Sequence, residues 1–138
     1  METQVKQQLG PNQEKWLKAL ESGEYKQGLR ALHMNTVTLG DRFCCLGVGC
    51  MTLDVERKKD SCILGGLVFG VAGVTALAPL ELLQALALRS RGGAFSSNTI
   101  VAGVEADSLV TLNDSGVSFQ QIAAFCREHP ELVFTEPR

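Results

Sequence analysis

The sequence lacks an excess of charge of either sign. Its 138 residues include 13 lysines and arginines and 15 aspartates and glutamates, which gives a formal net charge of −2 at pH 7. Proteins that bind nucleic acids or anionic lipid usually carry a basic patch, so we expect neither a nucleic-acid partner nor a membrane partner. Apolar residues at 45% and charged residues at 20% are typical of a globular chain, and the length suits one domain.

A secretory signal and a disulfide framework are also lacking. Residues 1–10 are polar and contain no apolar signal core. The five cysteines are odd in number, and Cys44 and Cys45 are adjacent, which makes a poor set for disulfide pairing. We therefore expect a reducing, cytoplasmic location, with the cysteines serving as small apolar residues. Residues 1–10 are expected to form a flexible arm, and residues 11–138 a single globular domain.

Motifs for metals and cofactors are absent as well. Cys44, Cys45 and Cys50 do not have the paired spacing of zinc ligands. The glycines near Gly66 and Gly70 match neither common phosphate-binding loop. The sequence predicts no metal and no cofactor.

One long apolar run could be mistaken for a membrane span. Residues 62–80 contain no charged residue, and a run of this length can cross a bilayer as a helix. Four glycines and several β-branched residues weaken that helix, and Pro79 then begins an amphipathic one. We expect residues 62–76, from Cys62 to Ala76, to form a strand or a hairpin that turns near Gly70 or Gly73, and residues 54–61 to form a charged surface loop.

Four segments have the apolar spacing and capping residues of amphipathic helices. The first is capped by Asn12 and ends at Gly23, the second runs from Pro79 to Gly92, the third is capped by Asp107, and the fourth follows Ser118, with Gln121 completing a capping box, and ends at His129. Phe134 is expected to hold the tail against the core.

The middle of the chain is harder to assign. Residues 43–53 are almost wholly apolar, so periodicity does not distinguish a buried helix from a buried strand. Their length and a capping residue at Asp41 favour a central helix surrounded by other elements. Residues 29–39 predict two short strands joined at residues 33–36. A further short strand is expected at residues 99–102. The sequence thus predicts an α+β fold, a mainly helical single domain with a small antiparallel sheet or hairpins.

Cys44 is the strongest candidate for chemistry. If Asp41 caps the central helix, Cys44 lies in its first turn, where the helix dipole can lower the pKa of a thiol. A thiol enzyme also needs a base, and the two histidines are His33 and His129. His33 is the candidate because it lies only eleven residues before Cys44. The alternative is that Cys44 fills the core with a raised pKa and is inert, and this reading is favoured because buried free cysteine is common.

Asp114 is a second candidate. With Asn113 it could bind a ligand or orient a base before the turn at Gly116. Asn and Asp at a helix end more often bond to the neighbouring backbone. We therefore assign no catalytic residue, and keep Cys44, His33 and Asp114 as weak candidates.

Three blocks of sequence resemble an uncharacterised family of small proteins encoded by bacteriophages and bacteria. They are residues 14–25 (EKWLKALESGEY), residues 43–48 (FCCLGV), and residues 112–119 (LNDSGVSF) followed by Ile122 and Ala123. The resemblance implies a phage- or microbe-derived soluble protein and carries no activity or catalytic residue. The chain departs from the family pattern at residues 62–76, where a more polar hairpin is expected.

Two functional hypotheses follow. The leading one is a non-enzymatic interaction or accessory protein that self-associates through residues 62–76, because a small domain can leave such an apolar segment partly exposed. The alternative is a small enzyme that uses a thiol, Cys44 with His33, or the carboxylate of Asp114. A membrane-associated protein is a third reading.

Overall fold

Helices and strands alternate irregularly along the chain. The computed structural model describes residues 8–56, 59–63, 66–69 and 77–138. The helices are α1 (Pro11–Ser22), α2 (Cys45–Thr52), α3 (Leu80–Leu86), α4 (Leu109–Asp114), α5 (Phe119–Glu128) and α6 (Pro130–Val133). The strands are β1 (His33–Thr36), β2 (Gly40–Phe43), β3 (Lys59–Ile63), β4 (Gly66–Phe69), β5 (Ala94–Val101) and β6 (Val104–Ser108). This confirms the α+β fold in a single domain with small antiparallel sheets.

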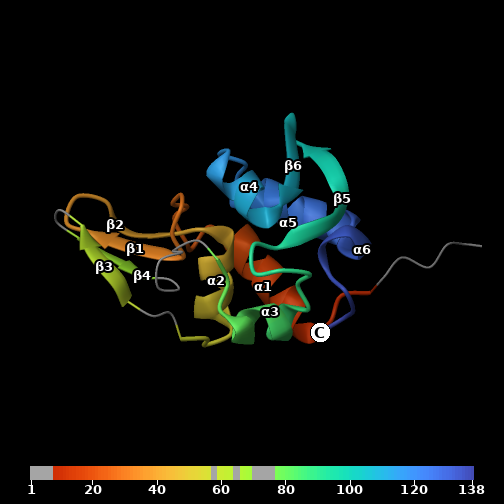
Figure 1. The fold of residues 1–138 in the computed structure, drawn as a ribbon, viewed down its shortest axis with the longest axis horizontal. Coiled ribbons are helices and arrows are strands. Elements are labelled where there is room, and N and C mark those ends of the chain that lie inside the picture. The colour runs from red at the N-terminus through yellow and green to blue at the C-terminus, as the bar shows by residue number, and fades with distance from the viewer. Residues whose placement is uncertain (1–7, 57–58, 64–65, 70–76) are drawn as a thin grey trace, which may run out of the picture.

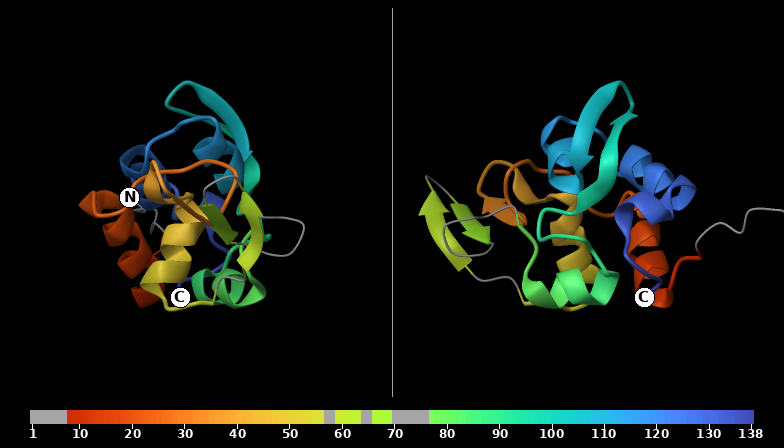
Figure 2. Two further views of the ribbon diagram at one scale, coloured as in Figure 1. Left: turned by 90° about the vertical axis from the view of Figure 1, so that its left-hand side faces the viewer. Right: turned by 45° about the vertical axis from the view of Figure 1, so that its right-hand side comes forward.

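The short helix α2 lies at the centre of the core. Every residue from Cys45 to Cys50 is buried, as expected for a helix that is apolar all round. Helix α1 packs against α2 and α5 through its apolar stripe of Trp16, Leu17 and Leu20. Figure 2 shows α2 and α1 within the helical part of the molecule. The prediction of a central helix is confirmed.

A glycine permits the closest contact of this helix. A Cβ built on Gly47 would lie 1.6 Å from the carbonyl oxygen of Leu32. The N–H of Cys44 also contacts the carbonyls of Ala31 and Leu32, at 3.3 Å each. Any side chain at position 47 would therefore separate α2 from residues 31–32.

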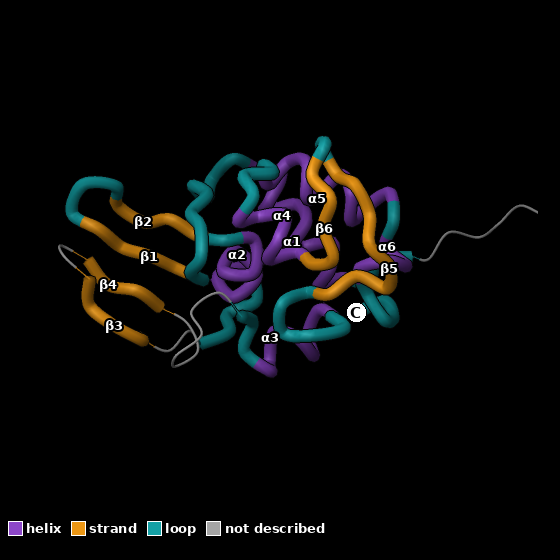
Figure 3. The backbone as a smooth tube through the Cα atoms, turned by 45° about the horizontal axis from the view of Figure 1, so that its top comes forward, coloured by secondary structure: helices purple, strands orange, loops and turns teal. Residues whose placement is uncertain are grey.

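The four-stranded sheet lies at one end of the molecule, beyond α2 (Figures 1 and 3). Its strand order is β2-β1-β4-β3, and all neighbours are antiparallel. We name residues 27–43, 59–63 and 66–69 the sheet end. The six helices, with the hairpin β5–β6 packed on them, are named the helical body.

Both predicted turns of the sheet end are misplaced. The first hairpin reverses at residues 37–39 and not at residues 33–36, because the Thr36 hydroxyl accepts a hydrogen bond from the N–H of Leu39 and Gly40 has a φ of +67°. Strand β3 begins at Lys59, inside the segment predicted as a loop. It pairs with β4 so that Ile63 faces Gly66, so this hairpin reverses before Gly70. Gly70 and Gly73 lie outside the described residues.

The apolar run that could match a membrane span is not one helix. Its described parts include Cys62 and Ile63 in β3 and the whole of β4. Across the described ranges, none of the helices has the length and apolar character needed to cross a bilayer.

The helix boundaries follow the predicted pattern with shifts at the caps. Gly10, not Asn12, caps α1, because the Asn12 side chain donates instead to the carbonyl of Ala85. Ser108, not Asp107, caps α4, with its hydroxyl accepting from the N–H of Thr111. The capping box of Ser118 and Gln121 is confirmed.

Helix α3 is shorter than the sequence predicted. Helix α3 ends at Leu86 rather than near Gly92, because Ala87 has a φ of +56° and Leu88 forms a β-bridge with Phe134. Strand β5 is correspondingly longer than the predicted residues 99–102. Phe134 is fully buried, with its ring edge-on to Trp16 at 6.1 Å between centroids, which confirms its predicted role.

Candidate functional site

Cys44 caps helix α2 instead of lying in its first turn. Its Sγ accepts a hydrogen bond from the N–H of Gly47 at 3.4 Å, and the residue is 3% exposed. Burial raises the pKa of the Cys44 thiol to about 11. Asp41, predicted as the cap, belongs to β2. The thiol is therefore protonated near neutral pH, which is unfavourable for a nucleophile.

His33 is held by aromatic and polar contacts across the first hairpin. Its ring stacks on Phe43 at 4.4 Å between centroids, and its Nε2 lies 2.7 Å from Oδ1 of Asp41. Asn35 donates to the same carboxylate oxygen at 2.7 Å. Tyr25, from the connector between α1 and β1, packs edge-on against Phe43. This arrangement fastens β1 to β2 and to the connector before β1.

Asn113 is fully buried at the end of α4 and bonds to distant parts of the chain. Its Oδ1 accepts from the N–H of Cys45 at 3.1 Å and from Nε2 of Gln27 at 3.0 Å. Its Nδ2 donates to the carbonyl of Gly28 at 2.9 Å and to Oδ1 of Asp114 at 3.3 Å. Both the oxygen and the nitrogen of the side-chain amide are thus hydrogen-bonded within the fold.

Asp114 also has a structural role, because it accepts a hydrogen bond from the backbone. Its Oδ1 accepts from the backbone N–H of Arg30 at 2.9 Å, in addition to Nδ2 of Asn113. Arg30 has a φ of +65°, so the carboxylate supports an unusual backbone turn. Asp114 is half-buried beside this turn.

The three sequence blocks meet at one residue, Cys45. Its N–H donates to Asn113, from the third block, and its carbonyl accepts from the indole N–H of Trp16, from the first block, at 2.9 Å. We name Trp16, Cys45 and Asn113 the Cys45 junction. It joins segments that are 29 and 68 positions apart in the chain. The recognisable residues of these blocks therefore specify how the core closes.

Burial also protects the other described thiols. Cys45 and Cys126 are fully buried, and burial raises the pKa of each thiol well above its usual value. Cys44, Cys45, Cys50 and Cys126 are all free thiols. Among the described residues, no group of three or more His, Cys, Asp or Glu side chains could hold a metal ion.

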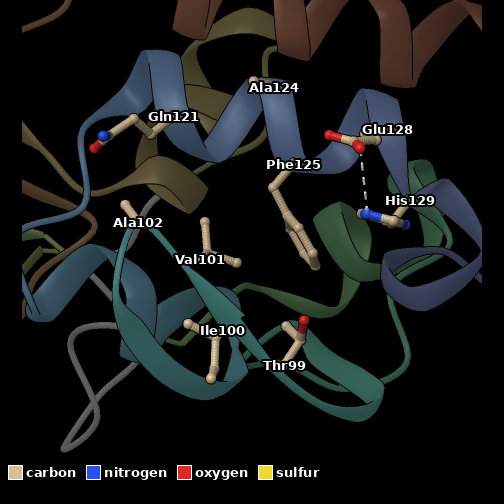
Figure 4. Close-up of a pocket in the computed structure, with 9 residues that line it drawn as sticks. All are labelled: Thr99, Ile100, Val101, Ala102, Gln121, Ala124, Phe125, Glu128 and His129. Atoms are coloured by element: carbon tan, nitrogen blue, oxygen red, sulfur yellow. Dashed lines mark ion pairs between the residues drawn. The ribbon is translucent and has the colours of Figure 1, made fainter.

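An open pocket lies between β5 and α5, where Figure 4 shows nine lining residues. Its volume is about 320 Å³, and Phe125 extends into it from α5 while Ile100 lines it from β5. At one end, Nε2 of His129 lies 3.8 Å from Oε1 of Glu128. That distance exceeds a hydrogen bond, so the pair contributes only when the imidazole is protonated. The sequence indicated His129 as a helix end and as one of the two histidines, of which His33 was the candidate base.

A second pocket of about 350 Å³ lies at the sheet end, between the connector and the hairpin β1–β2. Its lining includes Leu29, Met34, Leu39 and Arg42. No sequence signal pointed to it, because its walls come from separate short segments that form a concave surface only after folding.

Comparison with known proteins gives a family and no activity. The family model described as Domain of unknown function (DUF8296) matches residues 5–129, a range that contains all three sequence blocks. No curated protein and no solved structure matches the chain. Because the match covers most of the sequence, the chain belongs to the family of domains designated DUF8296.

Proposed function

We propose that the protein is a non-enzymatic interaction module that self-associates through the sheet end. The observation that carries this proposal is the position of the four-stranded sheet, which stands at one end of the molecule with β3 as an outer strand (Figure 1). Within the described ranges, no strand pairs with the outer side of β3. An outer strand can pair with the same strand of a second copy about a two-fold axis.

The sequence of the second hairpin supports this choice of surface. Strands β3 and β4 contribute residues 62–63 and 66–69 of the apolar segment 62–76, which is the segment expected to be only partly covered in so small a domain. The neighbouring hairpin adds exposed apolar side chains, with Val37 87% and Leu39 56% exposed. A second copy of the chain that extends the sheet would cover apolar surface at the same end.

The candidate catalytic residues support a non-enzymatic role. Cys44 and Asn113 are buried, and the carboxylate of Asp114 bonds to the backbone of Arg30. A thiol enzyme needs an accessible thiolate next to a base. Burial of Cys44 and its raised pKa are unfavourable for both requirements.

Sedimentation equilibrium across a wide range of protein concentration tests the self-association. We expect a dimer whose population falls in the variants Cys62→Lys and Ile63→Lys, because a lysine on an outer strand opposes strand pairing. Ile100→Lys, at a 71% exposed position of β5 in the helical body, is the matched control and should leave the dimer intact. A wild-type chain that stays monomeric at the highest concentration would refute the proposal. Circular dichroism of each variant checks that the fold persists.

Thiol labelling of the native protein tests the enzyme alternative. A Cys62→Ser variant removes the thiol that lies outside the described side chains. We expect the remaining four thiols to react only after denaturant is added, because they are buried. Rapid native labelling of Cys44 would instead favour a thiol enzyme.

The proposal extends to origin and location. The resemblance of the three blocks supports an accessory protein of bacteriophages or bacteria, and the free thiols support a reducing, cytoplasmic compartment. Fractionation of the expressing cell, with the thiol state measured in each fraction, tests the location.

A further inference from the structure

The pocket at the sheet end combines apolar walls with one charged side chain. Its apolar lining residues are Leu29, Ala31, Met34 and Leu39, and Arg42 also lines it. Leu29 is 47% exposed and Leu39 56% exposed, so solvent reaches these walls. A volume of about 350 Å³ is at the small end of the range for ligand pockets.

Arg42 is placed in this pocket by a glycine. A Cβ built on Gly28 would lie 2.7 Å from Cβ of Arg42, so a larger residue at position 28 would displace the arginine. Gly28 is itself fixed, because its N–H donates to the carbonyl of Phe43 at 2.7 Å and its carbonyl accepts from Asn113. The connector therefore lies directly against the first side-chain carbon of Arg42.

The Nε atom of the Arg42 guanidinium lacks an acceptor among the described residues. This atom is also buried from solvent. A guanidinium stays charged at all ordinary pH values, and a buried donor without an acceptor costs free energy. An anionic ligand that reaches Nε from the pocket would remove that cost.

The nearby acidic and polar groups are engaged elsewhere. Asp41 accepts from Asn35 and contacts His33, and Asp114 accepts from the backbone of Arg30. The Gln27 amide donates to Asn113 and to the carbonyl of Val117. Arg42 is the one charged residue among the described residues that line the pocket.

We propose that this pocket binds a carboxylate joined to a short aliphatic group. The carboxylate would accept hydrogen bonds from the guanidinium of Arg42, which presents donors in a planar fork that matches two carboxylate oxygens. The aliphatic group would pack against Leu29, Met34 and Leu39. This inference does not depend on self-association, since it rests on the connector and β2 and not on β3.

Titration of the ¹⁵N-labelled protein with hexanoate and with hexanol, followed by NMR, tests the proposal. The two probes share an aliphatic chain, and only hexanoate carries the carboxylate. We expect hexanoate to shift the amides of Gly28, Leu29 and Arg42 in a saturable way, and hexanol to bind at least about tenfold more weakly, as expected for loss of a charged hydrogen bond. Equal binding of the two probes, or no saturable shift, would overturn the proposal.

Variants assign the binding to Arg42. Arg42→Gln should weaken hexanoate binding about ten- to hundredfold and leave hexanol unchanged, whereas Arg42→Lys should retain part of the affinity because it keeps the charge and loses the fork. Lys18→Gln, at an exposed position of α1, is the matched loss of one positive charge, and this variant should bind hexanoate as the wild type does. Wild-type affinity in Arg42→Gln with its fold intact would contradict the assignment.

Two peptide probes distinguish the source of the carboxylate. A short peptide that ends in leucine with a free carboxylate is compared with the same peptide carrying a terminal amide. Binding of the free peptide more tightly than hexanoate would support a chain terminus as the ligand, and tighter binding of hexanoate would support a free aliphatic acid. Equal binding of the amidated and free peptides would contradict a role for the carboxylate in peptide binding.

Discussion

The helical body and the sheet end are held together by different kinds of contact. In the body, both backbone polar groups of Cys45 in α2 are hydrogen-bonded, the N–H to Asn113 and the carbonyl to Trp16, and all three residues are buried. At the sheet end, strand pairing and the contacts of His33 with Asp41 and Phe43 hold the first hairpin, while Val37 and Leu39 stay exposed. The polar groups of the Cys45 junction bond to one another, whereas the sheet end has exposed apolar side chains and an Arg42 Nε without a hydrogen-bond partner among the described residues.

The largest expected effect comes from Gly47, where the body is most tightly packed. Gly47→Ala should lower the free energy of unfolding by at least about 3 kcal/mol, because the new Cβ meets the backbone oxygen of Leu32. Urea denaturation measures the change. Gly49→Ala in the same helix is the control, since its Cβ would meet the movable end of Leu82 at 3.0 Å. Similar losses in both variants would break the comparison.

Removing the amide of Asn113 should have the next largest effect. Asn113→Ala leaves the N–H of Cys45 and the carbonyl of Gly28 without this partner inside the core. The expected loss is about 2–4 kcal/mol of unfolding free energy, measured by urea denaturation. Asn98→Ala, at an exposed position of β5, is the matched substitution and should change the free energy of unfolding by less than about 0.5 kcal/mol. A small effect at Asn113 would mean that the Cys45 junction contributes little.

Trp16→Phe tests the other side of the junction. The phenyl ring keeps an aromatic contact with Phe134 but cannot donate to the carbonyl of Cys45. We expect a loss of about 2 kcal/mol, from the missing hydrogen bond and the reduced side-chain volume. Thermal unfolding followed by circular dichroism measures it. An unchanged midpoint would show that packing alone places α1 on α2.

The smallest effect is expected at the tip of the first hairpin. Val37 is 87% exposed, so Val37→Thr should change the free energy of unfolding by less than about 0.5 kcal/mol. The same urea experiment applies. A loss comparable to that at Asn113 would show that the sheet end is as tightly coupled as the helical body.

Local signals predicted the helices well and the strand connections poorly. The spacing of Trp16, Leu17 and Leu20, and the capping box at Ser118, belong to single segments, so sequence alone reveals them. The first turn contains Val37 and Leu39, which are unusual turn residues, and it depends on a hydroxyl contact from Thr36. The early end of α3 depends on a bridge to Phe134, which is distant in sequence.

The candidate sites were less predictable than the fold. The sequence offered Cys44 as a reagent or as core, and burial places it in the core. It gave no sign that Asn113 bonds to Cys45 and Gly28, because such contacts depend on segments far apart in the chain. The sequence does not distinguish Arg42 from a surface arginine, because its contact with Gly28 and the burial of its Nε both depend on the fold.

The Cys45 junction also makes one backbone amide a reporter of the whole fold. The N–H of Cys45 is buried and bonded to a side chain 68 positions away, so the solvent can reach it only when α4 separates from α2. Deuterium uptake at this amide should therefore proceed through cooperative opening and rank among the slowest in the protein. Its exchange rate gives the global stability without denaturant, while the amides of Val37 and Leu39 exchange through local fluctuation.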